Sequence, residues 1–211
     1  LDDDVHVPPG WLAEMIACFQ DPTVALVSGP SLVPDDISWI ARLAGMALSS
    51  RAAGNVSARY VTGGDAPRPI KWSGIIGCNM LFRRSVFNEI GGFDPNFYPG
   101  EEMQASFKTS QRGHQLLFNP KAPVFHYPKQ SFRGFWRQIF RYGATRIRLI
   151  RSGVEVEWGP LVPGLWLFSI VVLGVGAFWS VWIARLLMLE RGLYALVILA
   201  CTLEVVATSR R

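Results

Sequence analysis

Cysteine is scarce in this chain of 211 residues, and its three cysteines lie far apart. They are Cys18, Cys78 and Cys201, and no two of them form a CxxC motif. A disulfide scaffold needs several paired cysteines, and a zinc ribbon needs two closely spaced pairs, so the sequence supports neither class. A reducing compartment is therefore expected.

Charged residues are also few, at 18%, while hydrophobic residues make up 50% and the mean hydropathy is +0.22. This balance excludes an intrinsically disordered chain, which combines low hydrophobicity with high charge. The net charge of +5 is distributed unevenly. Residues 1–40 contain no lysine or arginine, whereas residues 129–151 contain one lysine and six arginines and no acidic residue. The basic segment therefore indicates an anionic partner more clearly than the net charge does.

The chain starts on Leu1 and has no basic and apolar leader that would indicate a signal peptide. Its first residues, Leu-Asp-Asp-Asp, are typical of the interior of a domain. We therefore expect the natural protein to be longer at its N-terminus.

Residues 1–128 predict alternating helices and strands, which favours a mixed α/β domain. Asp35 or Asp36 is the expected N-cap of the second helix. Residues 53–71 lack periodicity and are expected to form a loop, and residues 91–95 a turn. The expected helices cover residues 11–20, 36–52, 85–90 and 101–112, and the expected strands cover residues 24–27, 75–82, 115–118 and 122–125.

Residues 129–158 form a separate unit that begins with a basic amphipathic helix over residues 129–151. Its apolar residues share one broad helical face, and Arg133, Arg137 and Arg141 recur every four residues on the other. Such a helix is typical of a membrane surface or of a partner-binding surface. An ordinary helix that faces the core, with solvated arginines, is the alternative.

Residues 159–211 contain two long apolar stretches. Residues 161–184 carry no charge, and residues 192–209 carry only Glu204. About 20 apolar residues are enough to cross a bilayer, so these stretches predict a transmembrane hairpin with its loop at residues 185–191. A buried or interfacial helix is the alternative for the second stretch. By the positive-inside rule, the basic helix and Arg210–Arg211 lie in the cytoplasm.

Two pairs of acidic residues are candidates for chemistry. Asp2 and Asp4 alternate along an extended segment and can converge, and carboxylate oxygens suit Mg²⁺ or Mn²⁺. Glu101 and Glu102 open a helix and offer a general base. Two ordinary explanations stay open, namely a solvated acidic turn for the aspartates and a favourable interaction with the helix dipole for the glutamates.

The order of the motifs along the chain resembles the inverting glycosyltransferases of family 2 in their membrane-anchored form, which have a Rossmann-like GT-A fold. The resemblance covers residues 1–150 and implies that residues 1–128 are the C-terminal part of the catalytic domain, because the nucleotide-binding half that precedes the DxD motif in the family is missing. The motifs are Gly77-Cys78-Asn79, Gly91-Gly92-Phe93-Asp94, Gly100-Glu101-Glu102, Gly113, Pro120, His126 and the segment from Gln138 to Tyr142.

The resemblance implies a role for each acidic pair. Asp2 and Asp4 match the DxD motif, which contacts the nucleotide sugar and the divalent metal, Mg²⁺ or Mn²⁺, on its diphosphate. Glu102 matches the catalytic base, and Glu101 could share this role. His126 matches a histidine that often closes the last strand, either as a metal or phosphate contact or as a structural residue.

Two further motifs are matched by the same resemblance. One is the QxxRW motif, which helps to hold the donor diphosphate or the acceptor and has Tyr in place of Trp here: Gln138, Arg141 and Tyr142. The other is the acceptor-side strand: Gly77, Cys78 and Asn79.

The resemblance thus implies metal-dependent transfer of a sugar, with inversion, from a nucleotide sugar to a lipid-linked or polysaccharide acceptor. The expected protein is a multi-pass cell-membrane protein that contacts membrane lipids and has its catalytic part in the cytoplasm. Nucleic acid is not an expected partner, because the arginines directly precede an apolar stretch. A degenerate or non-catalytic subunit is the alternative, because Glu102, Gln104 and Tyr142 depart from the usual family residues. Residues 1–211 alone are not expected to bind the donor tightly.

Overall fold

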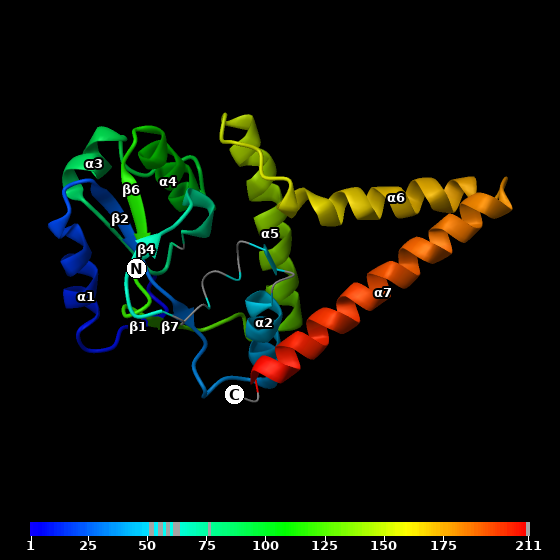
Figure 1. Ribbon diagram of the computed structural model, residues 1–211, viewed down its shortest axis with the longest axis horizontal. Helices are drawn as coiled ribbons and strands as arrows, with labels where there is room; N and C mark the ends of the chain where they lie inside the picture. Colours follow the sequence, from blue (N-terminus) through cyan, green and yellow to red (C-terminus); the bar gives the residue numbers. More distant parts are fainter. Residues whose placement is uncertain (51–52, 55–56, 58–59, 61–63, 76, 210–211) are drawn as a thin grey trace.

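The computed structural model describes residues 1–211 except residues 51–52, 55–56, 58–59, 61–63, 76 and 210–211. An α/β unit is followed by one long helix and then by two apolar helices that diverge from a shared turn (Figure 1). The last three helices are α5 (Phe132–Arg151), α6 (Val162–Gly176) and α7 (Val181–Ser209). The expected mixed α/β architecture with two apolar helices at its end is confirmed.

The α/β unit contains two small sheets. The first has the order β4-β6-β2-β5, in which β2 and β6 are parallel and the two edge strands are antiparallel to their neighbours. Its strands are β2 (Val24–Ser28), β4 (Arg68–Pro69), β5 (Met80–Phe82) and β6 (Gln115–Phe118). The second has the order β1-β7-β3, with strands β1 (Val5–His6), β3 (Ser31–Leu32) and β7 (Val124–His126).

Helices α1, α3 and α4 and the 3₁₀ turns η1 and η3 lie against these sheets, whereas α2 packs against α7 (Figure 1). Helix α1 packs on Val24 and Val27 of β2, and α4 packs with Leu26 and Leu116 of the same sheet. Burial of such side chains is the main favourable term in folding. The elements are α1 (Trp11–Ala17), α2 (Trp39–Ser49), α3 (Arg84–Glu89), α4 (Glu101–Gln111), η1 (Cys18–Gln20) and η3 (Trp72–Gly74).

The two sheets are joined by a pair of parallel segments, β2–β3 and β6–β7, that run side by side. Asn79 ties the two segments together where they pass from one sheet to the other. Its amide nitrogen donates to the carbonyl oxygens of Pro30 and Ala122, both at 2.8 Å, and its Oδ1 accepts from Nε1 of Trp11 at 2.9 Å. Gly29 lies so close to the Ala122 carbonyl that no Cβ would fit. The carboxyl ends of β3 and β7 are therefore held in a fixed register.

Replacing Asn79 with alanine should lower the free energy of unfolding by about 2–5 kcal/mol, because three buried polar partners lose their hydrogen bonds. The midpoint of thermal unfolding in detergent measures this effect. The control is Asn88→Ala, which removes an exposed asparagine from α3. Equal midpoints for the two variants would show that Asn79 does not join the sheets.

Most of the expected elements of the α/β unit are confirmed, but two are corrected. The expected caps Asp35 and Asp36 are wrong, because α2 begins after Ser38, whose Oγ accepts a hydrogen bond from the Ala41 amide at 3.2 Å. The expected strand over residues 75–82 shortens to β5, because the chain turns at residues 77–78 and bends at Asn79 before β5 begins at Met80.

Several expectations reach residues that the structure does not describe. These are the end of the second helix at residues 51–52, much of the loop over residues 53–71, residue 76 in the expected strand, and Arg210–Arg211. Within the described part of the loop, residues 68 and 69 form the edge strand β4.

The apolar hairpin turns at residues 177–180, and the expected loop at residues 185–191 is wrong. Arg185, Glu190 and Arg191 lie inside α7, because Arg, Glu and Leu all favour helix and a charge alone does not end one. The hydroxyl of Ser169 on α6 donates a hydrogen bond to Glu190 on α7. Glu190 is thus one of the residues that join the two helices.

Candidate functional site

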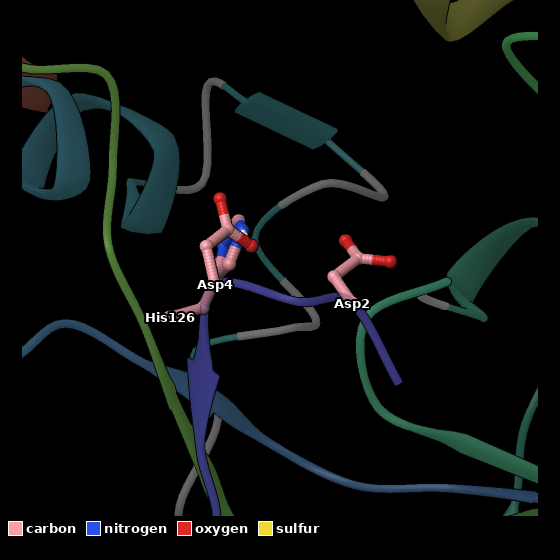
Figure 2. Close-up of side chains that lie close together, drawn as sticks. All are labelled: Asp2, Asp4 and His126. Carbon is pink, nitrogen blue, oxygen red and sulfur yellow. Dashed lines mark ion pairs between the residues drawn. The ribbon is translucent and has the colours of Figure 1, made fainter.

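Asp2, Asp4 and His126 converge at the carboxyl end of β7 (Figure 2). The antiparallel pairing of β1 with β7 sets Val5 opposite His126, which brings the preceding Asp4 beside the imidazole. Nε2 of His126 lies 3.1 Å from Oδ1 of Asp4, and the ligand atoms of all three residues lie within 4.8 Å of one another. Both aspartates are exposed, and the His126 side chain is 18% exposed. The cluster is therefore open to a ligand.

This set of two carboxylates and one imidazole fits a divalent cation such as Mg²⁺ or Mn²⁺. Hard cations prefer carboxylate oxygens, and Mn²⁺ also accepts an imidazole nitrogen. An isolated acidic turn would contain only neighbouring residues, whereas His126 comes from a distant strand and is held in place by the sheet. The three side chains are thus arranged as a candidate cation site.

Glu101 and Glu102 form the first turn of α4, directly after Gly100, whose φ of 108° favours glycine. Glu102 lies against Gly77, where an added Cβ would be 3.4 Å from Cγ of Glu102. Oε2 of Glu101 is buried and has no hydrogen-bond partner among the described residues. The N-terminal end of a helix interacts favourably with negatively charged side chains, so two glutamates are accommodated there.

A path of contacts links Glu102 to the acidic cluster. Gly77 touches Glu102, and the next residue, Cys78, places its Sγ 3.4 Å from Oγ of Ser31. Ser31 belongs to β3, which pairs with β7, the strand that ends in His126. Cys78 and Asn79 are buried, so their side chains hold the fold together, whereas Gly77 borders the candidate base.

The Gln138, Arg141 and Tyr142 motif lies in the first half of α5. Nε2 of Gln138 donates to the Tyr142 hydroxyl at 3.1 Å, one helical turn away, and both side chains are half-buried. Arg141 is exposed. The motif therefore presents the exposed guanidinium of Arg141 beside a hydrogen-bonded Gln–Tyr pair.

The second half of α5 docks on the loop that leads into α4, which the sequence analysis missed. Oγ1 of Thr145 donates to the Pro99 carbonyl at 3.2 Å, and the Thr145 methyl group fills the space next to Gly100. Arg148 donates to the carbonyls of Tyr98 at 2.8 Å and Asn96 at 3.1 Å. Thr145 follows Gln138 by seven residues, which places both on the same face of the helix. This spacing could have predicted that Thr145 faces the protein, as Gln138 does.

The aromatic face of α5 does not enter the core. Phe132, Trp136 and Phe140 are 71%, 66% and 71% exposed, and Arg133 and Arg137 next to them are exposed as well. The first half of α5 is therefore not an ordinary helix that packs its apolar face on the core, which was the alternative for this segment. The buried side chains of α5 are instead Thr145 and Leu149, in its second half.

Comparison with known protein families identifies this arrangement. The family model described as glycosyl transferase family group 2 matches residues 1–207. The chain belongs to this family. The match confirms the family and the enzyme class that the motifs predicted.

Three related glycosyltransferases share part of the sequence. The pre-mycofactocin glycosyltransferase of Mycobacterium tuberculosis is 26% identical over 178 residues, which are 83% of this chain and 36% of that protein. The glucosyl-dolichyl phosphate glucuronosyltransferase of Haloferax volcanii is 24% identical over 153 residues, 65% of this chain and 47% of that protein. The third relative, from Methanococcus voltae, is the dolichyl N-acetyl-alpha-D-glucosaminyl phosphate 3-beta-D-2,3-diacetamido-2,3-dideoxy-beta-D-glucuronosyltransferase. It is 30% identical over 87 residues, which are 39% of this chain and 26% of that protein. This family member thus spans less than half the length of each relative.

Proposed function

We propose that this protein transfers a sugar from a nucleotide-sugar donor to a lipid-linked or polysaccharide acceptor, with inversion at the anomeric carbon and with the help of a divalent metal. The observation that carries the proposal is the convergence of Asp2, Asp4 and His126 in a chain of this family. Glu102, at the start of α4 and against Gly77, supplies the second functional group.

Asp2, Asp4 and His126 would hold the metal, Mg²⁺ or Mn²⁺. When bound, a divalent cation neutralises negative charge on the donor diphosphate and on the departing nucleoside diphosphate. The exposed guanidinium of Arg141 suits diphosphate oxygens, because its planar fork donates two parallel hydrogen bonds. Donor binding therefore depends on residues of β7, of the segment before β1, and of α5.

Glu102 acts as the general base in this proposal. Its carboxylate accepts the proton of an acceptor hydroxyl, and the hydroxyl oxygen forms a bond to the anomeric carbon. The bond from that carbon to the diphosphate breaks, and its electron pair leaves with the nucleoside diphosphate. Because the attack comes from the face opposite the leaving group, the configuration inverts.

The nature of the acceptor is supported by two relatives and by the apolar helices. The names of the Haloferax volcanii and Methanococcus voltae proteins both include a dolichyl-linked sugar phosphate. An acceptor of this class resides in a membrane, and we propose that α6 and α7 insert into a membrane as well. A sugar attached to a polyprenyl phosphate is therefore the acceptor class to test first.

The assay uses the full-length protein in lipid vesicles with a panel of UDP-, GDP- and dTDP-sugars. Polyprenyl phosphate and glycosylated polyprenyl phosphate serve as acceptor probes. We expect Mn²⁺- or Mg²⁺-dependent release of nucleoside diphosphate together with incorporation of the sugar into the lipid fraction. Absence of turnover with every donor and acceptor would favour the degenerate or non-catalytic subunit instead.

We also propose that α6 and α7 insert into the cell membrane and leave the α/β unit in the cytoplasm. The apolar segments Gly159–Gly176 and Val181–Ala207 have 18 and 27 residues, and a rise of about 1.5 Å per residue makes each long enough to cross much or all of a bilayer core. Their large apolar side chains are mostly exposed, for example Phe168, Trp182 and Leu189. Exposure of so large an apolar surface to water is unfavourable, whereas its contact with lipid chains is not.

Cysteine labelling tests this topology. In intact cells, a membrane-impermeant maleimide should label Ser180→Cys at the turn between α6 and α7, and should label Ser152→Cys after α5 only once the membrane is permeabilised. The unsubstituted protein is the control: Cys18 and Cys78 are buried, and the partly exposed Cys201 lies inside α7. Equal labelling of the two positions in intact cells would contradict the topology.

A further inference from the structure

Helix α5 lies across the open end of the apolar hairpin (Figure 1). The end of α5 contacts the 3₁₀ turn η4 (Gly159–Leu161), which leads directly into α6, and the ion pair of Arg146 with Glu157 at 3.2 Å ties this half of α5 to the same segment. Just before the start of α5, Oε1 of Gln130 accepts a hydrogen bond from the amide of Ser38 at 3.4 Å, at the N-cap of α2, and α2 contacts α7. Because we propose that α6 and α7 enter the membrane from one side, α5 runs along the membrane surface between the start of α6 and the end of α7.

Helix α5 turns one face to the α/β unit and the opposite face away from it. Leu149 is buried in the core of the α/β unit. Phe140 precedes Leu149 by nine residues, which is about two and a half helical turns, so the two side chains lie on opposite sides of α5. Trp136 and Phe132 precede Phe140 at intervals of four residues and therefore lie beside it, and all three rings are mostly exposed. We call Phe132, Trp136 and Phe140 the aromatic row of α5.

A second row of side chains, which we call the basic row, runs directly beside the aromatic row. Its members are Arg133, Arg137 and Arg141; each follows one aromatic residue of that row, and all three are exposed. Residues 129–151 contain no acidic residue, and within the part of the chain that the structure describes these arginines form no ion pair with a carboxylate. Aromatic rings suit the boundary between lipid chains and water, and guanidinium groups pair with phosphate oxygens. The two rows together therefore fit an amphiphile that has an apolar chain and a phosphate.

We propose that Arg133 and Arg137 bind the phosphate of the lipid-linked acceptor, whose apolar chain lies against the aromatic row. This inference rests on the proposed function, in which the acceptor is a sugar attached to a polyprenyl phosphate. It deepens that function, because it assigns the acceptor phosphate to two arginines that precede the motif of Gln138, Arg141 and Tyr142.

The position of the basic row favours the acceptor over an ordinary membrane lipid. Its third member, Arg141, is the arginine that we propose for the donor diphosphate. A rise of about 1.5 Å per residue places Arg137 about 6 Å and Arg133 about 12 Å from Arg141 along the helix axis. This separation leaves room for a sugar between the lipid phosphate and the donor, which is where the attacking hydroxyl has to lie.

The test is the KM for the lipid acceptor in the double variant Arg133→Gln with Arg137→Gln. The full-length protein is assayed in vesicles of phosphatidylcholine, which has no net charge, with the polyprenyl phosphate acceptor that the unsubstituted protein glycosylates in the panel assay. We expect this KM to rise about 30-fold, because each arginine near a lipid phosphate contributes about fivefold in affinity. The KM for the nucleotide sugar should stay within about twofold, because Arg141 and the candidate cation site are unchanged.

A binding measurement tests the same site without a donor. Radiolabelled polyprenyl phosphate is titrated into the detergent-solubilised full-length protein. Its dissociation constant should also rise about 30-fold in the double variant, whereas polyprenol, which lacks the phosphate, should bind the variant and the unsubstituted protein equally. Arg84→Gln is the matched control, because it removes an exposed arginine from α3 and should change neither the KM nor the dissociation constant.

The outcomes separate this inference from the proposed function. If the double variant glycosylates the lipid acceptor with an unchanged KM, the inference is wrong and the proposed function stands. If phosphatidylglycerol displaces polyprenyl phosphate at equal concentration, the basic row binds any anionic lipid, and the inference is wrong as well. If no acceptor is glycosylated but the double variant loses polyprenyl phosphate, the proposed function fails while the binding of a lipid phosphate by the basic row stands.

Discussion

Replacing Glu102 with glutamine should reduce the rate of sugar transfer by about 10²–10⁴-fold, the usual contribution of a general base. Glutamine has nearly the same shape, so the contact with Gly77 is retained, but its amide cannot accept the proton of the acceptor hydroxyl. Donor binding should stay within about twofold, because the effect belongs to the transition state. Initial rates of nucleoside diphosphate release and equilibrium binding of the donor measure the two quantities.

Two variants provide the comparison for Glu102→Gln. Glu101→Gln should lose less activity than Glu102→Gln, because one oxygen of Glu101 is buried within the protein. Glu89→Gln, on α3 next to Arg112, should keep its activity. If Glu102→Gln transfers sugar at the rate of the unsubstituted protein, Glu102 is not the base. If Glu101→Gln shows the larger loss, the first glutamate has that role.

Replacing Asp4 with asparagine should weaken Mn²⁺ binding by about 100-fold or more, because loss of even an outer partner of a metal ligand costs about 10–100-fold. Asp4 offers a charged oxygen to the metal, and its Oδ1 also lies 3.1 Å from Nε2 of His126. The substitution therefore removes a charged ligand and also the ion pair that holds the His126 imidazole. Sugar transfer should fall in parallel. Electron paramagnetic resonance of Mn²⁺ titrated into the protein measures binding without any donor.

Asp3→Asn is the matched control for Asp4→Asn. It removes the same charge from the neighbouring position, but Asp3 does not belong to the cluster of Asp2, Asp4 and His126. Equal Mn²⁺ affinities for Asp3→Asn and Asp4→Asn would contradict the proposed site. Full sugar transfer after removal of divalent metal by EDTA would contradict the proposed metal dependence.

Local sequence signals predicted the helix that carries Glu102, but not the short strand β1 that places Asp4. The helix over residues 101–111 follows from Gly100 at its start and from two glutamates in its first turn, and both signals act over a few residues. The strand over residues 115–118 follows likewise from a short apolar run before Asn119-Pro120. Local patterns therefore placed Glu102 on its helix correctly.

Contacts between distant segments could not be predicted in the same way. The approach of His126 to Asp4 depends on strand pairing between opposite ends of the α/β unit. The resemblance named both residues, but only the fold brings their side chains together. The ion pair of Arg146 with Glu157 likewise depends on how the chain returns after α5, and no local pattern encodes it.

The apolar hairpin shows a different limit of sequence patterns. A hydropathy pattern treats Arg185, Glu190 and Arg191 as the end of a span, although these residues favour helix and extend α7. The contact between Ser169 and Glu190 then satisfies one of these polar groups inside the hairpin. The turn falls instead at residues 177–180, just after Gly176.

The configuration of the first product tests the central claim, direct displacement assisted by Glu102. With an α-linked nucleotide sugar as donor, proton NMR of the product formed early in the reaction should show a β-linked sugar, because a single displacement inverts the anomeric carbon. An α-linked first product would mean retention. Direct attack by an acceptor hydroxyl that Glu102 deprotonates would then be wrong.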